Sequence, residues 1–259
     1  MPRFRARQAL WEIKGKIAKL PGLYPAFRWA TERLGENRVY PLLWGPMRGF
    51  RWRRYNGVSY WYHLGLYEPH VSALLLSHLR PGDMFWDVGA NAGYHALLAS
   101  RVVGESGRVV AFEPDPAAVE ILRDEFALND MHCDVEQVAL SDRAGTAVLR
   151  RHENCLMSAL DGVPDGPTGE PLDVEASTLD AMAERYGPPQ VIKMDIEGGE
   201  RFALPGGDGL LSGPDRPRLL LSVHGSEVEA FCVEFLEARD YQIESQTGFE
   251  QMLIAVPRP

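Results

Sequence analysis

The sequence has little cysteine and no long apolar run. Its three cysteines, Cys133, Cys155 and Cys232, are odd in number and lack the spacing of metal ligands, so neither a disulfide framework nor a zinc site is predicted. No apolar stretch approaches the roughly 18 residues of a membrane-spanning helix. Glu12 and Lys14 interrupt the basic N-terminus where a signal peptide needs an apolar core. We therefore expect a cytoplasmic protein in a reducing compartment.

Positive charge is scarce except near the N-terminus. Residues 1–60 hold 13 Lys and Arg against three acidic residues, a net charge of +10, which leaves −19 for residues 61–259 of a chain whose total is −9. Leu10, Ile13, Ile17 and Leu20 recur at helical spacing, which predicts a helix. This helix either packs its apolar stripe on the body or brings residues 1–20 to an anionic membrane or a phosphorylated substrate.

Aromatic and Arg side chains alternate between Pro41 and Tyr62. The stretch Phe50–Tyr62 is typical of a β-hairpin that turns at Asn56-Gly57. Such a patch can also stack RNA bases, but the acidic remainder and the lack of an RNA-binding motif make a nucleic-acid partner a weaker interpretation. With 45% hydrophobic residues over a length of 259, we expect a basic extension at 1–62 and one domain at 63–259.

The stretch Met84–Tyr94 predicts a strand, a tight turn and a helix. It carries the pattern Asp87-x-Gly89-x-x-x-Gly93, in which Gly89 can adopt a conformation closed to other residues and Gly93 allows a close approach. A nicotinamide dinucleotide site prefers three glycines as Gly-x-Gly-x-x-Gly, and this turn has two. An ordinary turn capped by Asn91 is the alternative to a ligand site.

Acidic residues at this turn favour a cationic nucleoside over a phosphate. Asp87 would repel phosphate and suits the amino and sulfonium groups of S-adenosylmethionine. About 20 residues beyond the turn, the strand Arg108–Phe112 ends in Glu113, where a Rossmann-like unit places a carboxylate against ribose hydroxyls. The two features together predict a nucleoside site.

Strand and helix patterns then alternate in the order of a βαβαβ unit. A helix is predicted at Pro116–Asn129 and a third strand at Val135–Leu140. Asp142 follows that strand, where it either accepts a hydrogen bond from an adenine amino group or serves only as a turn residue. The turn-rich stretch at 161–171 is typical of a lid or a substrate-facing loop.

A second group of polar residues follows later strands. Val191–Met194 is a predicted buried strand, and Lys193, Asp195 and Glu197 concentrate charge at its carboxyl end. His224 follows the apolar strand Arg218–Val223 and is the one base near neutral pH so placed. Because ligands of open α/β sheets bind beyond these strand ends, these residues predict a site.

The chain resembles the FkbM-type family of S-adenosylmethionine-dependent methyltransferases over residues 65–256. The motifs that carry the resemblance are Gly65-Leu-Tyr-Glu68, Pro81-Gly-Asp83, Asp87-Val-Gly-Ala-Asn-Ala-Gly-Tyr94, Ala111-Phe-Glu-Pro114, Ser177-Thr-Leu-Asp180, Ile192-Lys-Met-Asp-Ile-Glu-Gly-Gly-Glu200 and His224. It implies an α/β, Rossmann-like class I methyltransferase fold, with a seven-stranded, mostly parallel sheet ordered 3-2-1-4-5-7-6. Helices would cover both faces, and the N-terminal helix and hairpin would form an extension.

The resemblance also implies a cofactor, a reaction and site residues. S-adenosylmethionine would be the cofactor, and the reaction would be O-methylation of a sugar, glycolipid or secondary metabolite. The residues expected at the cofactor are Glu68, Asp87, Gly89, Asn91, Gly93, Glu113 and Asp142. The residues expected at the acceptor, as the catalytic group, are Asp195, His224, Glu197 and Lys193.

Several alternatives stay open at this stage. His224 is the expected base, and a divalent metal ion on Asp195 and Glu197 is less favoured because two carboxylates lack a clear third ligand. An RNA methyltransferase and a non-catalytic binding module that docks through its basic arm are the competing functions. The sequence predicts no particular oligomeric state.

Overall fold

A seven-stranded sheet forms the centre of the computed structural model, which describes residues 35–55, 60–63, 65–151, 158–163, 169–247 and 251–258. The strand order is β12-β13-β11-β10-β3-β4-β5. The strands are β3 (Met84–Val88), β4 (Arg108–Phe112), β5 (Asp134–Glu136), β10 (Val191–Met194), β11 (Arg218–Val223), β12 (Tyr241–Thr247) and β13 (Gln251–Pro257). Five neighbouring strands, from β5 to β11, are parallel, and the β12–β13 hairpin adds an antiparallel strand to β11. Counted along the chain from the β5 edge, the order is 3-2-1-4-5-7-6, which confirms the prediction.

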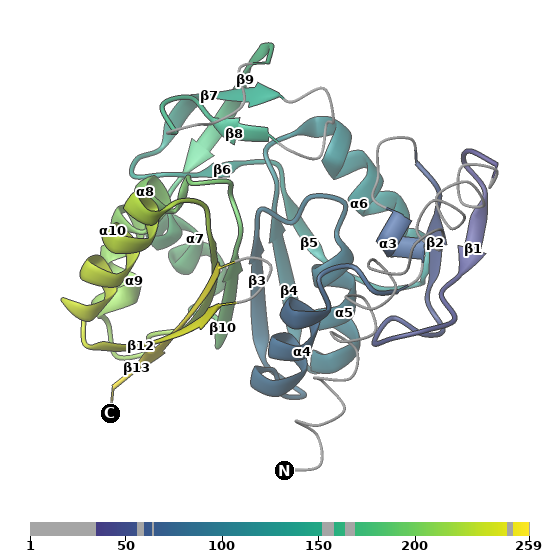
Figure 1. Cartoon of the computed structure of the whole chain (residues 1–259), viewed down its shortest axis with the longest axis horizontal. Helices are drawn as coiled ribbons and strands as arrows, with labels where there is room; N and C mark the ends of the chain where they lie inside the picture. Colours follow the sequence, from purple (N-terminus) through teal and green to yellow (C-terminus); the bar gives the residue numbers. More distant parts are fainter. Residues whose placement is uncertain are drawn as a thin grey trace.

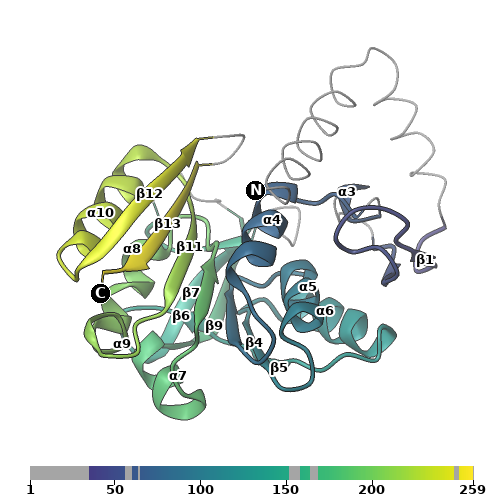
Figure 2. The same cartoon turned by 90° about the horizontal axis from the view of Figure 1, so that it is seen from below.

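Alternation of side chains along the strands divides the core into two layers. In β3, Phe85 points to one face of the sheet, and Trp86 and Val88 point to the other. Figure 2 shows helices on both faces. The first face packs on α4 (Pro69–His78), α5 (Tyr94–Val103) and α6 (Pro116–Leu128), and the second packs on α7 (Leu179–Tyr186), α8 (Glu200–Ala203), α9 (Asp208–Ser212) and α10 (Ser226–Glu237). A short 3-10 helix, η1 (Pro205–Gly207), joins α8 to α9.

Local signals fix where two of these helices begin. The Asp115 carboxylate accepts a hydrogen bond from Ala117 N at the start of α6, with Pro116 as the first helical residue. Thr178 Oγ1 accepts from Ala181 N at the start of α7. Helix α6 begins where the sequence predicts, at Pro116.

A second, four-stranded sheet lies across one end of the main sheet (Figure 1). Its order is β6-β9-β7-β8, with strands β6 (Ala139–Leu140), β7 (Gly145–Arg151), β8 (Ser158–Leu160) and β9 (Pro171–Ser177). The prediction of one strand at Val135–Leu140 is wrong, because β5 stops at Glu136, opposite the last residue of β4, Phe112. Beyond that point the chain pairs with β9 as β6.

The predicted hairpin over Phe50–Tyr62 is also wrong. Strand β2 (Arg51–Arg53) pairs with the earlier strand β1 (Val39–Pro41), and α3 (Tyr60–His63) is a helix. Burial explains this, since the Trp52 ring lies 5.0 Å from the Tyr62 ring and 5.7 Å from the Tyr94 ring, within the core under α5. The division into 1–62 and 63–259 stays a prediction.

Two further predictions fall on residues that the structure does not describe. The helix at residues 10–20 and the turn at Asn56-Gly57 lie outside the described ranges. Within those ranges, no helix combines the length and the apolar character that a membrane span requires.

Candidate active site

A cavity of about 250 Å³ opens at the carboxyl ends of the central strands, beneath the small sheet. Strands β3, β4, β10 and β11 each end there, because parallel strands bring their carboxyl ends to one edge. The predicted site residues that line this cavity are Glu68, Gly89, Asn91, Glu113, Lys193, Asp195, Glu197 and His224. The fold therefore brings the residues predicted at the cofactor and the residues predicted at the acceptor into one site.

Three predicted cofactor residues do not line the cavity. Asp87 is 0% exposed and lies beneath its floor. Gly93 starts helix α5, and a side chain there would meet Leu122 of α6 at 2.7 Å. Asp142 is exposed and lies 3.6 Å from Arg143, so the cavity wall after β5 consists of Val138, Ala139 and Leu140 instead. None of these three residues is placed to contact a ligand in the cavity.

The turn after β3 is shaped by close contact with the neighbouring loop. Gly89 has a φ of 74°, and a Cβ atom there would lie 2.0 Å from the carbonyl oxygen of Asp195. Only glycine fits this position. Asn91 is not the helix cap, because the cap position belongs to Gly93, and the Asn91 side chain accepts a hydrogen bond from Ala92 N at 2.6 Å.

Glu113 is held at the end of β4 by two backbone groups. Its Oε2 accepts from Asn91 N at 2.8 Å and its Oε1 accepts from Asp115 N at 2.9 Å. The residue is only 8% exposed, and burial raises the pKa of Glu113 to about 7 against the lowering effect of these hydrogen bonds. Each carboxylate oxygen keeps a further lone pair for a hydroxyl of a ligand.

Lys193 connects the two strands beneath the cavity. It stands directly opposite Asp87 in the parallel pair of β10 and β3, so both side chains project from the same face, with Nζ 3.2 Å from Asp87 Oδ1. Nζ also donates to the Gly89 carbonyl oxygen at 3.1 Å and lies 3.8 Å from Asp195 Oδ2. Burial opposes the charged form, but Asp87, Asp195 and Glu68 together raise the pKa of Lys193. Lys193 is therefore a fixed cation and not a base.

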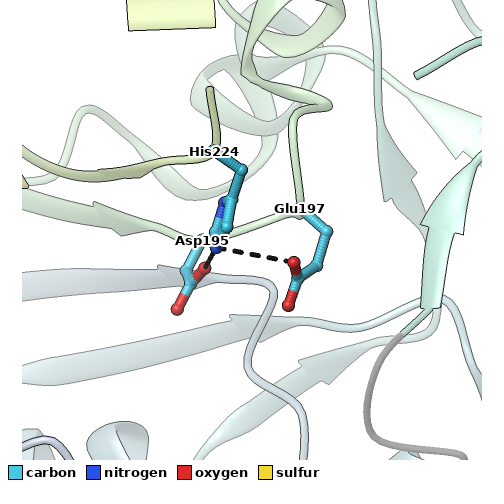
Figure 3. A group of neighbouring side chains, drawn as sticks. All are labelled: Asp195, Glu197 and His224. Carbon is cyan, nitrogen blue, oxygen red and sulfur yellow. Dashed lines mark ion pairs between the residues drawn. The ribbon is translucent and has the colours of Figure 1, made fainter. Parts of the chain in front are cut away.

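Asp195, Glu197 and His224 point toward one another (Figure 3), and all three line the cavity. His224 Nε2 lies 3.4 Å from Glu197 Oε2 and 3.9 Å from Asp195 Oδ1. The carboxylates follow β10 and the imidazole follows β11, which pair in parallel. The side chains are 19%, 36% and 37% exposed, in that order, so they remain accessible to a molecule in the cavity.

An aromatic wall that sequence reasoning did not assign faces the turn. Tyr62 and Tyr67 stack with ring centroids 4.1 Å apart, and the Tyr94 ring meets both edge-on at 5.1 and 5.5 Å. His95 Nδ1 lies 3.7 Å from Glu68 Oε2 behind this wall. Tyr67 and Tyr94 belong to the motifs Gly65–Glu68 and Asp87–Tyr94, whereas Tyr62 lies outside every motif of the resemblance.

The small sheet supplies the apolar part of the cavity. Leu149 of β7 and the β8 residues Ser158–Leu160 line it, opposite Phe112 and Val138. The loop predicted at 161–171 stays a prediction, because its described residues, 161–163 and 169–171, do not line the cavity and residues 164–168 lie outside the described part of the chain.

The cavity fits S-adenosylmethionine by the chemistry of its walls. Glu113 offers carboxylate oxygens to ribose hydroxyls, and the apolar side chains around Phe112 suit a purine ring. Glu68 and the tyrosine rings offer negative charge and aromatic faces to a cationic methionine end.

Comparison with known proteins identifies related sequences. The family model described as the methyltransferase FkbM domain matches residues 87–250. The 31-O-demethyl-FK506 methyltransferase FkbM of Streptomyces tacrolimicus is 31% identical over 158 residues, 49% of this chain and 60% of the relative. The hexuronic acid methyltransferase AglP of Haloferax volcanii is 29% identical over 152 residues, 54% of this chain and 56% of the relative. The matches thus span little more than half the length of either relative.

Solved structures of methyltransferases are also similar. Precorrin-6y C5,15-methyltransferase of Geobacter metallireducens has a TM-score of 0.48 at 15% identity, over 73% of this chain and 89% of that one. Fibrillarin of Aeropyrum pernix, solved with S-adenosyl-L-methionine, has a TM-score of 0.47 at 13% identity, over 72% of this chain and 74% of that one.

Proposed function

Since the chain belongs to the FkbM methyltransferase family, we propose that it transfers a methyl group from S-adenosylmethionine to a hydroxyl oxygen of a small molecule or glycolipid. The observation that carries this proposal is the shared cavity. The ribose carboxylate Glu113 and the polar cluster of Asp195, Glu197 and His224 open onto the same space of about 250 Å³. Donor and acceptor can therefore meet in one enclosed site.

The residues at the cofactor end bind and orient S-adenosylmethionine. S-adenosylmethionine supplies an activated methyl group on a sulfonium, which becomes neutral when the methyl leaves. Glu113 holds the ribose, and Glu68 with Tyr67 faces the cationic end of the cofactor. Lys193 fixes the turn by its bond to the Gly89 carbonyl and keeps Asp87 and Asp195 in place.

The residues at the other end prepare the acceptor. A hydroxyl must lose its proton as its oxygen takes the methyl group, and the carboxylates of Asp195 and Glu197 stabilise positive charge at the point where the proton leaves. The small sheet covers one side of the cavity with apolar side chains, and the polar cluster stays partly exposed, so solvent water can take the proton. The names of two relatives, a hexuronic acid methyltransferase and a 31-O-demethyl-FK506 methyltransferase, support a hydroxylated sugar or secondary metabolite as the acceptor.

Metabolite and lipid extracts from cells with and without the protein test this function. Purified protein is incubated with each extract and S-adenosylmethionine that carries an isotope-labelled methyl group. We expect a labelled product in the small-molecule or glycolipid fraction. The same methylated compound, unlabelled, should already be present in cells that contain the protein. RNA is incubated in parallel, and label that enters only RNA would make the protein an RNA methyltransferase.

We also propose peripheral contact with an anionic membrane, which suits a glycolipid acceptor. Leu43 and Trp44 are adjacent and 61% and 66% exposed, within the extension of net charge +10. Trp favours the membrane interface, and each Lys or Arg near anionic lipid adds roughly 1 kcal/mol. The protein is expected to sediment with anionic vesicles at low salt and to release at high salt.

Two variants separate the parts of this membrane prediction. The double substitution Leu43→Ser with Trp44→Ser should lower vesicle binding several-fold, and removal of residues 1–20 should abolish it. Both variants should still bind S-adenosylmethionine, since the cofactor turn begins after residue 83. Equal binding to neutral vesicles, or none to anionic ones, contradicts the membrane contact.

A further inference from the structure

The acceptor end of the cavity has the dimensions of a metal-coordination shell. One ligating atom each of Asp195, Glu197 and His224 lies within 4.8 Å of the other two, and His224 Nε2 lies 3.4 Å from Glu197 Oε2. Metal–ligand bonds of about 2.0–2.2 Å place neighbouring ligand atoms on one ion about 3 Å apart. Small side-chain rotations therefore bring all three atoms to one ion.

The two oxygens of the Asp195 carboxylate face different partners, which leaves one of them toward Glu197 and His224. Lys193 lies 3.8 Å from Asp195 Oδ2, whereas Asp195 Oδ1 faces His224. The lysine therefore fixes one oxygen of the carboxylate, as groups around a metal site commonly orient a ligand.

A buried carboxylate beside the cluster gives an independent indication. Glu200 is 0% exposed, and its Oε1 accepts from Ile196 N at 3.0 Å. Its Oε2 is buried and has no hydrogen-bond partner among the residues that the structure describes. A divalent cation bound nearby would interact favourably with this buried carboxylate oxygen.

We infer that Asp195, Glu197 and His224 form a binding site for a divalent metal ion. The sequence alone offered two carboxylates without a third ligand, and the fold supplies that ligand from the end of β11. One imidazole and two carboxylates form a donor set that suits manganese, and three protein ligands leave positions open for a substrate.

The site makes His224 a metal ligand in the reaction. This role rests on the proposed function. Its Nε2 lone pair binds the ion, so His224 is a ligand and not the base. The acceptor hydroxyl takes an open position, where the ion lowers the pKa of that hydroxyl. Its proton passes to solvent water, and the new oxygen–carbon bond forms as the carbon–sulfur bond of S-adenosylmethionine breaks.

Manganese titration of the full-length protein tests the site. After treatment with EDTA and dialysis, Mn²⁺ is added in the presence of saturating S-adenosylhomocysteine, and bound ion is measured by electron paramagnetic resonance. We expect one ion per chain. Glu197→Gln and His224→Ala should each weaken binding by at least about tenfold.

His132→Ala is the matched control. His132 Nε2 lies 3.9 Å from Asp134 Oδ1, the same separation as in the His224–Asp195 pair, but its side chain is 89% exposed and lies outside the cavity. This variant should bind Mn²⁺ as the wild type does. Failure of the wild type to bind, or equal binding by all four proteins, overturns the metal site. Calorimetry with S-adenosylhomocysteine reports separately on the proposed function, because loss of that binding would contradict the cofactor and not the ion.

Discussion

Replacing His224 by alanine or Asp195 by asparagine is expected to lower the rate of methyl transfer by at least about 100-fold. The two side chains lie 3.9 Å apart at the acceptor end of the cavity, where charge changes as the hydroxyl loses its proton. The affinity for S-adenosylmethionine should change little, because the ribose and methionine contacts lie on other elements. Single-turnover rates and calorimetry on the same preparations measure the two quantities.

The outcome for Asp195 distinguishes two roles. Its carbonyl oxygen packs against Gly89 and its Oδ2 lies 3.8 Å from Lys193, so a change there can also disturb the cofactor turn. If Asp195→Asn abolishes cofactor binding together with activity, its main role is structural. His132→Ala, a surface change, should keep the wild-type rate.

Replacing Glu113 by alanine is expected to weaken S-adenosylmethionine binding by on the order of 1–3 kcal/mol, because charge-assisted hydrogen bonds to the ribose are lost. About 1.4 kcal/mol corresponds to a tenfold change in the dissociation constant. Thermal unfolding must accompany the calorimetry, since the same carboxylate accepts from Asn91 N and Asp115 N. Unchanged affinity in a folded variant, or tight binding of NAD by the wild type, would contradict the assigned cofactor.

Glu113 should also make cofactor binding depend on pH. Burial raises the pKa of Glu113 to about 7, so the carboxyl gains a proton as the pH falls below 7 and loses part of its capacity to accept hydrogen bonds. Affinity should therefore be full above pH 7 and fall by up to about tenfold per pH unit below it. Glu113→Gln should remove this component, and a wild-type affinity that is constant between pH 6 and 8 contradicts it.

The sequence determined the main sheet, because its signals are local. The apolar run of β3 and the residues Pro116 and Thr178 at helix starts each act within a few residues of their position. At the cofactor turn the positive φ of Gly89, 74°, is a local requirement for glycine, whereas the contact that excludes a Cβ atom there comes from the distant Asp195 carbonyl oxygen. Sequence motifs in order were thus sufficient to predict the fold and the family.

Tertiary structure decided what depends on partners distant in the chain. The hairpin at Phe50–Tyr62 was a sound local inference, but burial of Trp52 and Tyr62 against Tyr94 outweighed the turn signal. The strand at Val135–Leu140 divided because its partner β4 ends at Phe112. In both cases pairing and packing, which local pattern does not contain, set the result.

The same distinction holds within the site. Sequence placed Asp87 at the turn, but only the register of β3 against β10 shows it paired with Lys193 beneath the cavity. Sequence placed Asp195 and His224 after separate strands, and only the parallel pairing of β10 with β11 brings their side chains within 3.9 Å. Local patterns determine which strands carry chemical groups. The register of the sheet determines which of those groups meet, because strands that are neighbours in a sheet can be far apart along the chain.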